Sequence, residues 1–176
     1  MKKLGTLLIS FSLIFLIGCS TDSNNDPPAQ SGFDLTGSWI MSSYSYFGSR
    51  TDIFVEDVVQ YQFTGIGWEI NMLMEFMESP NNYTSVGSYF VDHIVTNQDG
   101  QEFLYYGYFD KNDQGTWSRI HNDVLLTLEG ETNQGYISEL TDDNLELIIE
   151  SSSQETATDG TVTNITRTDI YNFIKE

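Results

Sequence analysis

Apolar and polar residues alternate with a period of two along most of the chain from residue 36 onward. Val59, Tyr61 and Phe63, for example, alternate with Gln60 and Gln62. Such alternation gives a strand one buried and one wetter face, as in antiparallel sheets. Short segments rich in Gly, Asn and Asp separate the runs and favour turns. We predict eight to ten strands at about 36–47, 52–64, 68–77, 83–96, 101–110, 115–121, 123–129, 135–140, 144–151 and 161–174.

Several of the predicted turns are marked by glycine together with small polar residues, which is the usual chemistry of tight turns. The segments 130–135 and 151–160 are polar and are predicted to be loops. The other turn signals that divide neighbouring strands are Gly48-Ser49, Gly65-Ile66-Gly67 and Asn112-Asp113-Gln114-Gly115.

The segment 68–77 has two interpretations. As a strand, it places Trp68, Ile70, Met72, Met74 and Phe76 on one face. Helical spacing of some of its apolar residues is the alternative. We favour the strand, because the alternation is the longer pattern and starts at a two-glycine turn.

Many short sequential strands without alternating helices predict an all-β fold. The simplest closure is an antiparallel up-and-down barrel, since a closed ring removes exposed strand edges.

The N-terminus carries a different pattern. Met1-Lys2-Lys3 is followed by an apolar run from Leu7 to Ile17, and Gly18 then precedes Cys19. A cationic start, a short apolar run and a small residue are typical of a secretory signal. The run is shorter than the about 20 apolar residues of a transmembrane helix. We therefore predict a signal peptide at residues 1–18.

Residues 19–32 are polar, include Pro27-Pro28, and are too poor in apolar residues to form a core. We expect a lipidated Cys19 followed by a flexible tether, and a single β-barrel domain at residues 33–176. Cys19 is the only cysteine, and lipidation accounts for an odd cysteine in an exported protein.

The chain is strongly acidic, with 26 Asp and Glu against 7 Lys and Arg and a net charge of -19. No basic patch is present, which argues against a nucleic-acid partner. Anionic lipids would repel the body of the protein, so membrane attachment must come from a lipid anchor.

The stretch Leu16-Ile17-Gly18-Cys19 resembles the lipobox of bacterial lipoproteins. This resemblance implies cleavage before Cys19 and lipidation of its side chain. Ser20 follows the cysteine, and by resemblance to enteric lipoproteins it favours the outer membrane; the periplasmic and surface faces both remain open.

The order of short motifs from Gly37-Ser38-Trp39 through Gly115-Thr116-Trp117 to the closing segment 168–173 resembles lipocalin-like lipoproteins common in Bacteroidota. The resemblance implies a barrel of the lipocalin or calycin type, in which Gly37 bends the first strand and Trp39 plugs the closed end. It also implies that Arg167 lies over Trp39. Trp117 is an alternative plug. The usual lipocalin disulfide and long first loop are absent, which argues against a deep transport pocket.

Catalytic and metal signals are weak. His93 and His121 belong to no metal-binding cluster and are interpreted as ordinary polar residues. Residues 110–121 begin like a calcium loop but lack its last acidic ligand, so we predict a hairpin turn there. No Gly-x-Ser-x-Gly elbow is present. We predict no enzyme, no metal and no cofactor.

Aromatic and methionine side chains suggest a binding function instead. We expect a small apolar or amphipathic ligand to bind in the barrel, against the residues Trp68, Met72, Met74, Tyr105 and Phe109. The alternative is a non-enzymatic accessory surface lipoprotein with a solid core, docking a protein or a glycan through exposed aromatics.

Overall fold

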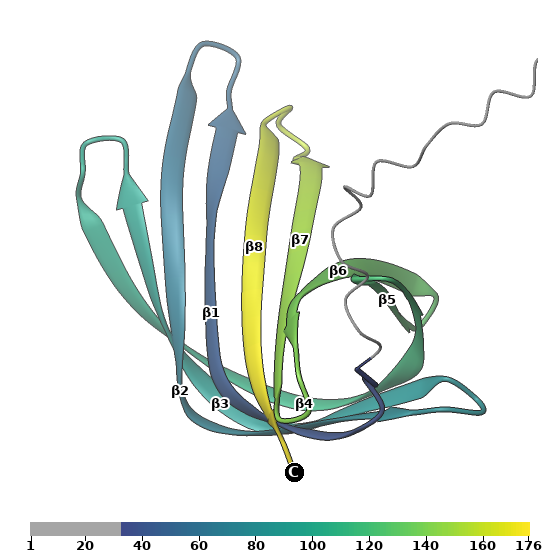
Figure 1. Cartoon of the computed structure of the whole chain (residues 1–176). Helices are drawn as coiled ribbons and strands as arrows, with labels where there is room; N and C mark the ends of the chain where they lie inside the picture. The colour runs from purple at the N-terminus through teal and green to yellow at the C-terminus, as the bar shows by residue number, and fades with distance from the viewer. Residues whose placement is uncertain (1–32) are drawn as a thin grey trace, which may run out of the picture.

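A computed structural model describes residues 33–176, which form eight antiparallel strands in one closed ring (Figure 1). Each strand pairs with the next, and β8 pairs with β1, so the predicted up-and-down barrel is confirmed. The predicted signal peptide, Cys19 and the tether lie outside the described residues. The strands are β1 (Gly37–Ile53), β2 (Val58–Met77), β3 (Asn82–Asn97), β4 (Glu102–Ile120), β5 (Asp123–Leu128), β6 (Glu131–Leu140), β7 (Asn144–Thr156) and β8 (Val162–Lys175).

The strand count is lower than ten because glycines that resemble turn signals lie inside long strands. Each of three such glycines faces an inward aromatic ring on the neighbouring strand. At Gly65, an added Cβ would lie 2.1 Å from the ring of Tyr46, so the missing side chain makes room for that ring. The predicted strands 68–77 and 115–121 are therefore continuations of β2 and β4. The three pairs are Gly48 with Phe63, Gly65 with Tyr46, and Gly115 with Tyr83.

Two predicted loops are also wrong. Residues 131–135 belong to β6, because the turn before it is only two residues long. Glu129 and Gly130 have φ angles of 52° and 88°, which suit a tight two-residue hairpin turn. Residues 151–156 extend β7, where they continue the register with β8 as far as Thr156 opposite Val162.

An irregularity in β2 turns Trp68 away from the interior. The register with β3 shifts between Trp68, which pairs with Phe90, and Asn71, which pairs with Ser88. An extra residue in a strand reverses which residues face inward beyond it. Trp68 consequently lies on the outer face beside Phe90, whereas Met72 lines the interior. The strand assignment of this segment is confirmed, but the predicted shared face for Trp68 and Met72 is wrong.

The closed end of the barrel is filled by apolar rings around Trp39. Trp39 is 0% exposed, and its indole N–H donates to the carbonyl of Leu35 at 2.8 Å. Trp117 is also buried and donates to the carbonyl of Met77 at 2.9 Å. The cation over Trp39 is Lys175, whose Nζ lies 4.3 Å from the ring centroid.

The predicted contact of Arg167 with Trp39 is therefore wrong. In the register of β8, Lys175 lies opposite Trp39, while Arg167 lies opposite Gly48, eight residues further from the closed end along β8.

The opposite end of the barrel is open along one side. The ladder between β4 and β5 covers only residues 116–120 of β4, and that between β6 and β7 stops at Ile149. Within residues 33–176, the rest of β4 and residues 150–156 of β7 therefore have a strand partner on one side only. Figure 1 shows the hairpins β1–β2, β3–β4 and β7–β8 extending past the short strands β5 and β6. This leaves the upper inner face accessible from the side. In the same part of the chain, no helix has the length and apolar character needed to cross a membrane.

Candidate functional site

The barrel interior contains two hollow spaces at different heights. The lower one, about 180 Å³, has mainly apolar walls that include Met41, Met72, Met74, Leu126 and Leu147. The upper one, about 470 Å³, lies toward the open end. It is lined by Tyr46, Arg50, Asp52, Tyr61, Phe63, His93, Val95, Tyr105, Ile165 and Arg167.

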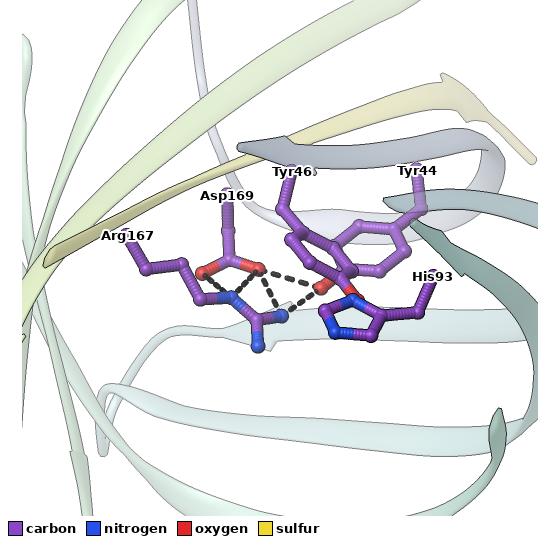
Figure 2. Close-up of polar contacts among 5 residues, drawn as sticks. All are labelled: Tyr44, Tyr46, His93, Arg167 and Asp169. Carbon is purple, nitrogen blue, oxygen red and sulfur yellow. Dashed lines mark hydrogen bonds and ion pairs between the residues drawn. The ribbon is translucent and has the colours of Figure 1, made fainter. Parts of the chain in front are cut away.

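Arg167, which lines the upper cavity, forms an ion pair with Asp169 two residues further along β8 (Figure 2). The Nε of Arg167 donates to both carboxylate oxygens of Asp169, at 3.0 and 2.9 Å, and its Nη2 donates to Oδ1 at 2.6 Å. Nη2 also donates to the hydroxyl of Tyr44 at 2.5 Å, and that hydroxyl donates to Asp169. Burial alone would lower the pKa of Arg167, but the hydrogen bonds to Asp169 and the electrostatic attraction of Tyr44, Asp169 and Tyr171 together outweigh it and hold the pKa above its usual value. The guanidinium is thus charged and fixed in direction.

A layer of tyrosines lies beside this pair. The ring of Tyr44 is 4.8 Å from that of Tyr171 and 5.1 Å from that of Tyr89. Burial raises the pKa of all three hydroxyls, that of Tyr89 to about 12. The layer therefore remains neutral at physiological pH.

Tyr46 and His93 form the wall next to Arg167. The Tyr46 hydroxyl lies 2.5 Å from Nδ1 of His93, and the guanidinium carbon of Arg167 lies 3.9 Å from the centre of the Tyr46 ring. Burial and the charge of Arg167 lower the pKa of His93. A neutral His93 can accept a hydrogen bond from the Tyr46 hydroxyl at Nδ1, which fixes the ring that covers Arg167.

A second arginine lies nearer the open end of the same cavity. The Nε of Arg50 donates to Asp52 at 2.9 Å, and the hydroxyl of Thr163 donates to the same carboxylate at 2.7 Å. The hydrogen bond from Arg50 lowers the pKa of the Asp52 carboxyl. Half of the Arg50 side chain, 50%, remains exposed.

The ion pairs of the interior share one sequence pattern, which the sequence prediction missed. Residues two apart on a strand lie on the same face, so a cation followed two residues later by an acid forms an inward pair. This two-residue spacing could have identified the ion pairs from the sequence, but two of the three pairs border segments that were predicted to be turns. The pairs are Arg50 with Asp52, Lys111 with Asp113, and Arg167 with Asp169.

The five residues predicted to bind a ligand are not brought together. Met72 and Met74 line the lower cavity, and Tyr105 lines the upper one. The ring of Phe109 stacks on Tyr89 at 5.2 Å. Trp68 lies outside, where its indole N–H donates to Asp92 at 2.9 Å. Whether each of them binds a ligand stays a prediction.

The predicted hairpin turn at residues 110–115 is wrong, because these residues run through the middle of β4. Their side chains therefore alternate between the two faces of the sheet, and Lys111 and Asp113 point into the lower cavity. In the part of the chain that the structure covers, no cluster of three or more His, Cys, Asp or Glu could hold a metal ion.

Comparison with known proteins gave one match. Residues 35–147 match a protein family described as the lipocalin-like domain. No curated protein and no solved structure matches the chain.

Proposed function

This chain belongs to the lipocalin-like domain family, and from that premise we propose that it is a lipid-anchored cell-envelope protein that binds a small apolar or amphipathic ligand in its barrel. The family fold is a ligand-binding barrel in general, and its members are typically non-enzymatic binding proteins. We accordingly propose no catalytic activity for this chain.

The observation that carries the ligand proposal is the size and position of the upper cavity. Pockets for small molecules measure about 300–1,000 Å³. At about 470 Å³ the upper cavity falls in this range, whereas the lower cavity of about 180 Å³ is too small for most ligands. We therefore place the ligand in the upper cavity, which it can reach through the side opening between β4 and β7.

A cavity-filling substitution tests this proposal with a matched control. Val95 lines the upper cavity, and its neighbour Ile94 points to the outer face of the same strand. We expect Val95→Trp to weaken binding of the fluorescent apolar probe phenylnaphthylamine at least tenfold, while Ile94→Trp leaves it unchanged. Near-ultraviolet circular dichroism checks that both variants are folded. Equal binding by Val95→Trp and the unmodified protein would place the ligand elsewhere.

The anchor proposal rests on the sequence around Cys19 and on where the described chain begins. The carbonyl of Phe33 accepts a hydrogen bond from Arg119 at 2.9 Å, which places the start of the domain at the closed end of the barrel. A lipid attached at Cys19 would therefore be connected to the barrel at its closed end. We favour the outer membrane as the site of anchoring, on its periplasmic or its surface face.

Cell fractionation tests the anchor. We expect Cys19→Ser to release the protein into soluble fractions or to leave it with its signal peptide uncleaved. A variant that is cleaved normally and still sediments with membranes would refute the lipoprotein assignment.

A second candidate function is docking of a glycan on the outer face of β2, β3 and β4. The rings of Trp68 and Phe90 are 4.7 Å apart, and those of Phe90 and Tyr108 are 5.0 Å apart. Trp68 and Tyr108 are 40% and 59% exposed, so they offer apolar faces for sugar rings. The net charge of -19 favours a neutral polysaccharide over an anionic one. The solid core that accompanied this alternative is not found, because the interior is hollow.

Affinity electrophoresis through gels containing soluble starch or galactomannan tests this candidate. Trp68→Ala should abolish any retardation, while Phe47→Ala, which removes another exposed ring, should not. Migration unaffected by either polysaccharide counts against glycan docking.

A further inference from the structure

Every lysine and arginine of residues 33–176 lies on the inner face or at the closed end of the barrel. Arg50 and Arg167 line the upper cavity, and Lys111 lines the lower one. Arg119 and Lys175 bind backbone carbonyls at the closed end. Three of these five cations therefore line the interior, and two of the three line the upper cavity, where a ligand would meet them.

Arg167 is held so that one edge of its guanidinium faces the cavity. Its Nε and Nη2 are occupied by Asp169 and Tyr44 (Figure 2). Among the described residues no hydrogen bond reaches its Nη1, and this atom is not buried, because no buried side-chain nitrogen lacks a partner. With 32% of the side chain exposed and the group lining the cavity, Nη1 is available to a ligand.

The orientation of this group is fixed before any ligand arrives. Asp169 fixes the guanidinium in the plane, and the ring of Tyr46 lies against its face at 3.9 Å. A donor that is already oriented loses little conformational entropy on binding. Hydrogen bonds to a charged group contribute more than bonds between neutral groups, especially away from bulk water.

The rest of the cavity indicates what else the ligand must carry. The walls include Phe63, Val95, Tyr105 and Ile165, which suit an apolar body. Two arginines and one carboxylate, Asp52, line the cavity, and Asp169 lies behind Arg167. His93 adds no charge while it is neutral. Since the two carboxylates offset the formal charge of the two arginines, the cavity favours a single negative charge over a dianion.

We propose that the ligand is an amphipathic organic monoanion whose acidic group binds Nη1 of Arg167, with Arg50 nearby and the apolar part against Phe63 and Val95. This inference rests on the proposed function, because it requires a ligand in the upper cavity. Asp169 and Tyr44 are positioning residues that direct the guanidinium, and Arg167 is the group that touches the ligand.

Two fluorescent probes with the same skeleton separate charge recognition from apolar binding. Anilinonaphthalene sulfonate is anionic, and phenylnaphthylamine lacks the sulfonate. Arg167→Lys keeps a charge beside Asp169 but removes the forked donor. The double variant Arg167→Leu with Asp169→Leu removes the pair together, so no buried carboxylate is left alone. Arg119→Gln, an arginine outside the cavity, is the matched control.

We expect both Arg167 variants to lose about tenfold or more in affinity for the sulfonate probe, as for one charged hydrogen bond. Affinity for the uncharged probe should change less than twofold, and Arg119→Gln should change neither. Near-ultraviolet circular dichroism verifies folding of each protein. Equal losses for both probes, or no loss for either, would overturn the role of Arg167 while leaving the proposed ligand site in place. Failure of the unmodified protein to bind either probe would refute the ligand site itself.

Discussion

Gly87 in β3 is the position where adding one methyl group should damage the barrel most. Its φ angle is 128°, a conformation that residues with a side chain rarely adopt. A Cβ built there would lie 1.9 Å from the backbone oxygen of Asn71, on the irregular part of β2. Both strands would have to move, because the obstacle is backbone rather than a flexible side chain.

The expected cost of Gly87→Ala has two parts. A residue held in such a backbone region costs about 1–3 kcal/mol. Forcing a methyl group into a filled space costs about a further 1–3 kcal/mol through backbone shifts. We therefore expect a loss of about 4 kcal/mol in the free energy of unfolding, a large part of the 5–15 kcal/mol typical of domains.

Gly100→Ala is the matched control for this substitution. Gly100 has a φ of 78°, and nothing lies within 4 Å of the position of its Cβ. The free energy of unfolding of Gly100→Ala should therefore fall by only about 1–2 kcal/mol, which is the cost of placing a side chain at a positive φ. Urea unfolding at neutral pH, followed by tryptophan fluorescence, measures both. If Gly87→Ala costs no more than Gly100→Ala, the close approach of β3 to Asn71 does not exist in solution.

Two further predictions concern His93 and the closed end. Because burial lowers the pKa of His93 in the folded state, the unfolded chain binds a proton first as the pH falls below its usual value near 6.5. The free energy of unfolding should therefore decrease as the pH falls from 7 toward the lower pKa of His93 in the folded state. In urea titrations at several pH values, His93→Gln should lack this pH-dependent decrease, and His121→Gln should keep it. Trp39→Ala should cost about 3–5 kcal/mol because the ring is fully buried, whereas Trp68→Ala should cost less than about 1 kcal/mol. Thermal unfolding of the two tryptophan variants tests this difference, and equal costs would contradict it.

The period-two pattern was sufficient to predict strands and an antiparallel barrel, because it reports directly which face of a strand is buried. The sequence prediction placed turns wrongly where a glycine makes room for a side chain of the neighbouring strand. Gly65 resembles a turn signal in the sequence, yet it lies within β2 to accommodate the ring of Tyr46. That function depends on a partner in another strand and cannot be recognised locally.

The candidate site was less predictable for the same reason. The spacing of Arg167 and Asp169 places both on one face of a strand, and this much is readable from the sequence. Their contacts with Tyr44 and Tyr46 depend on the register between β8 and β1, more than 120 residues apart. The outward position of Trp68 depends on one irregular residue step in β2, which alternation alone does not reveal.

The inward placement of the cations also has a kinetic consequence for any anionic ligand. From a distance the molecule presents only its net charge of -19, so an approaching anion is repelled until it passes between the strands. Salt screens this repulsion over about 8–10 Å but acts less on the sheltered contact with Arg167. Raising the ionic strength should therefore speed association of a monoanion with the barrel, the opposite of the usual behaviour of a charged ligand and an oppositely charged site.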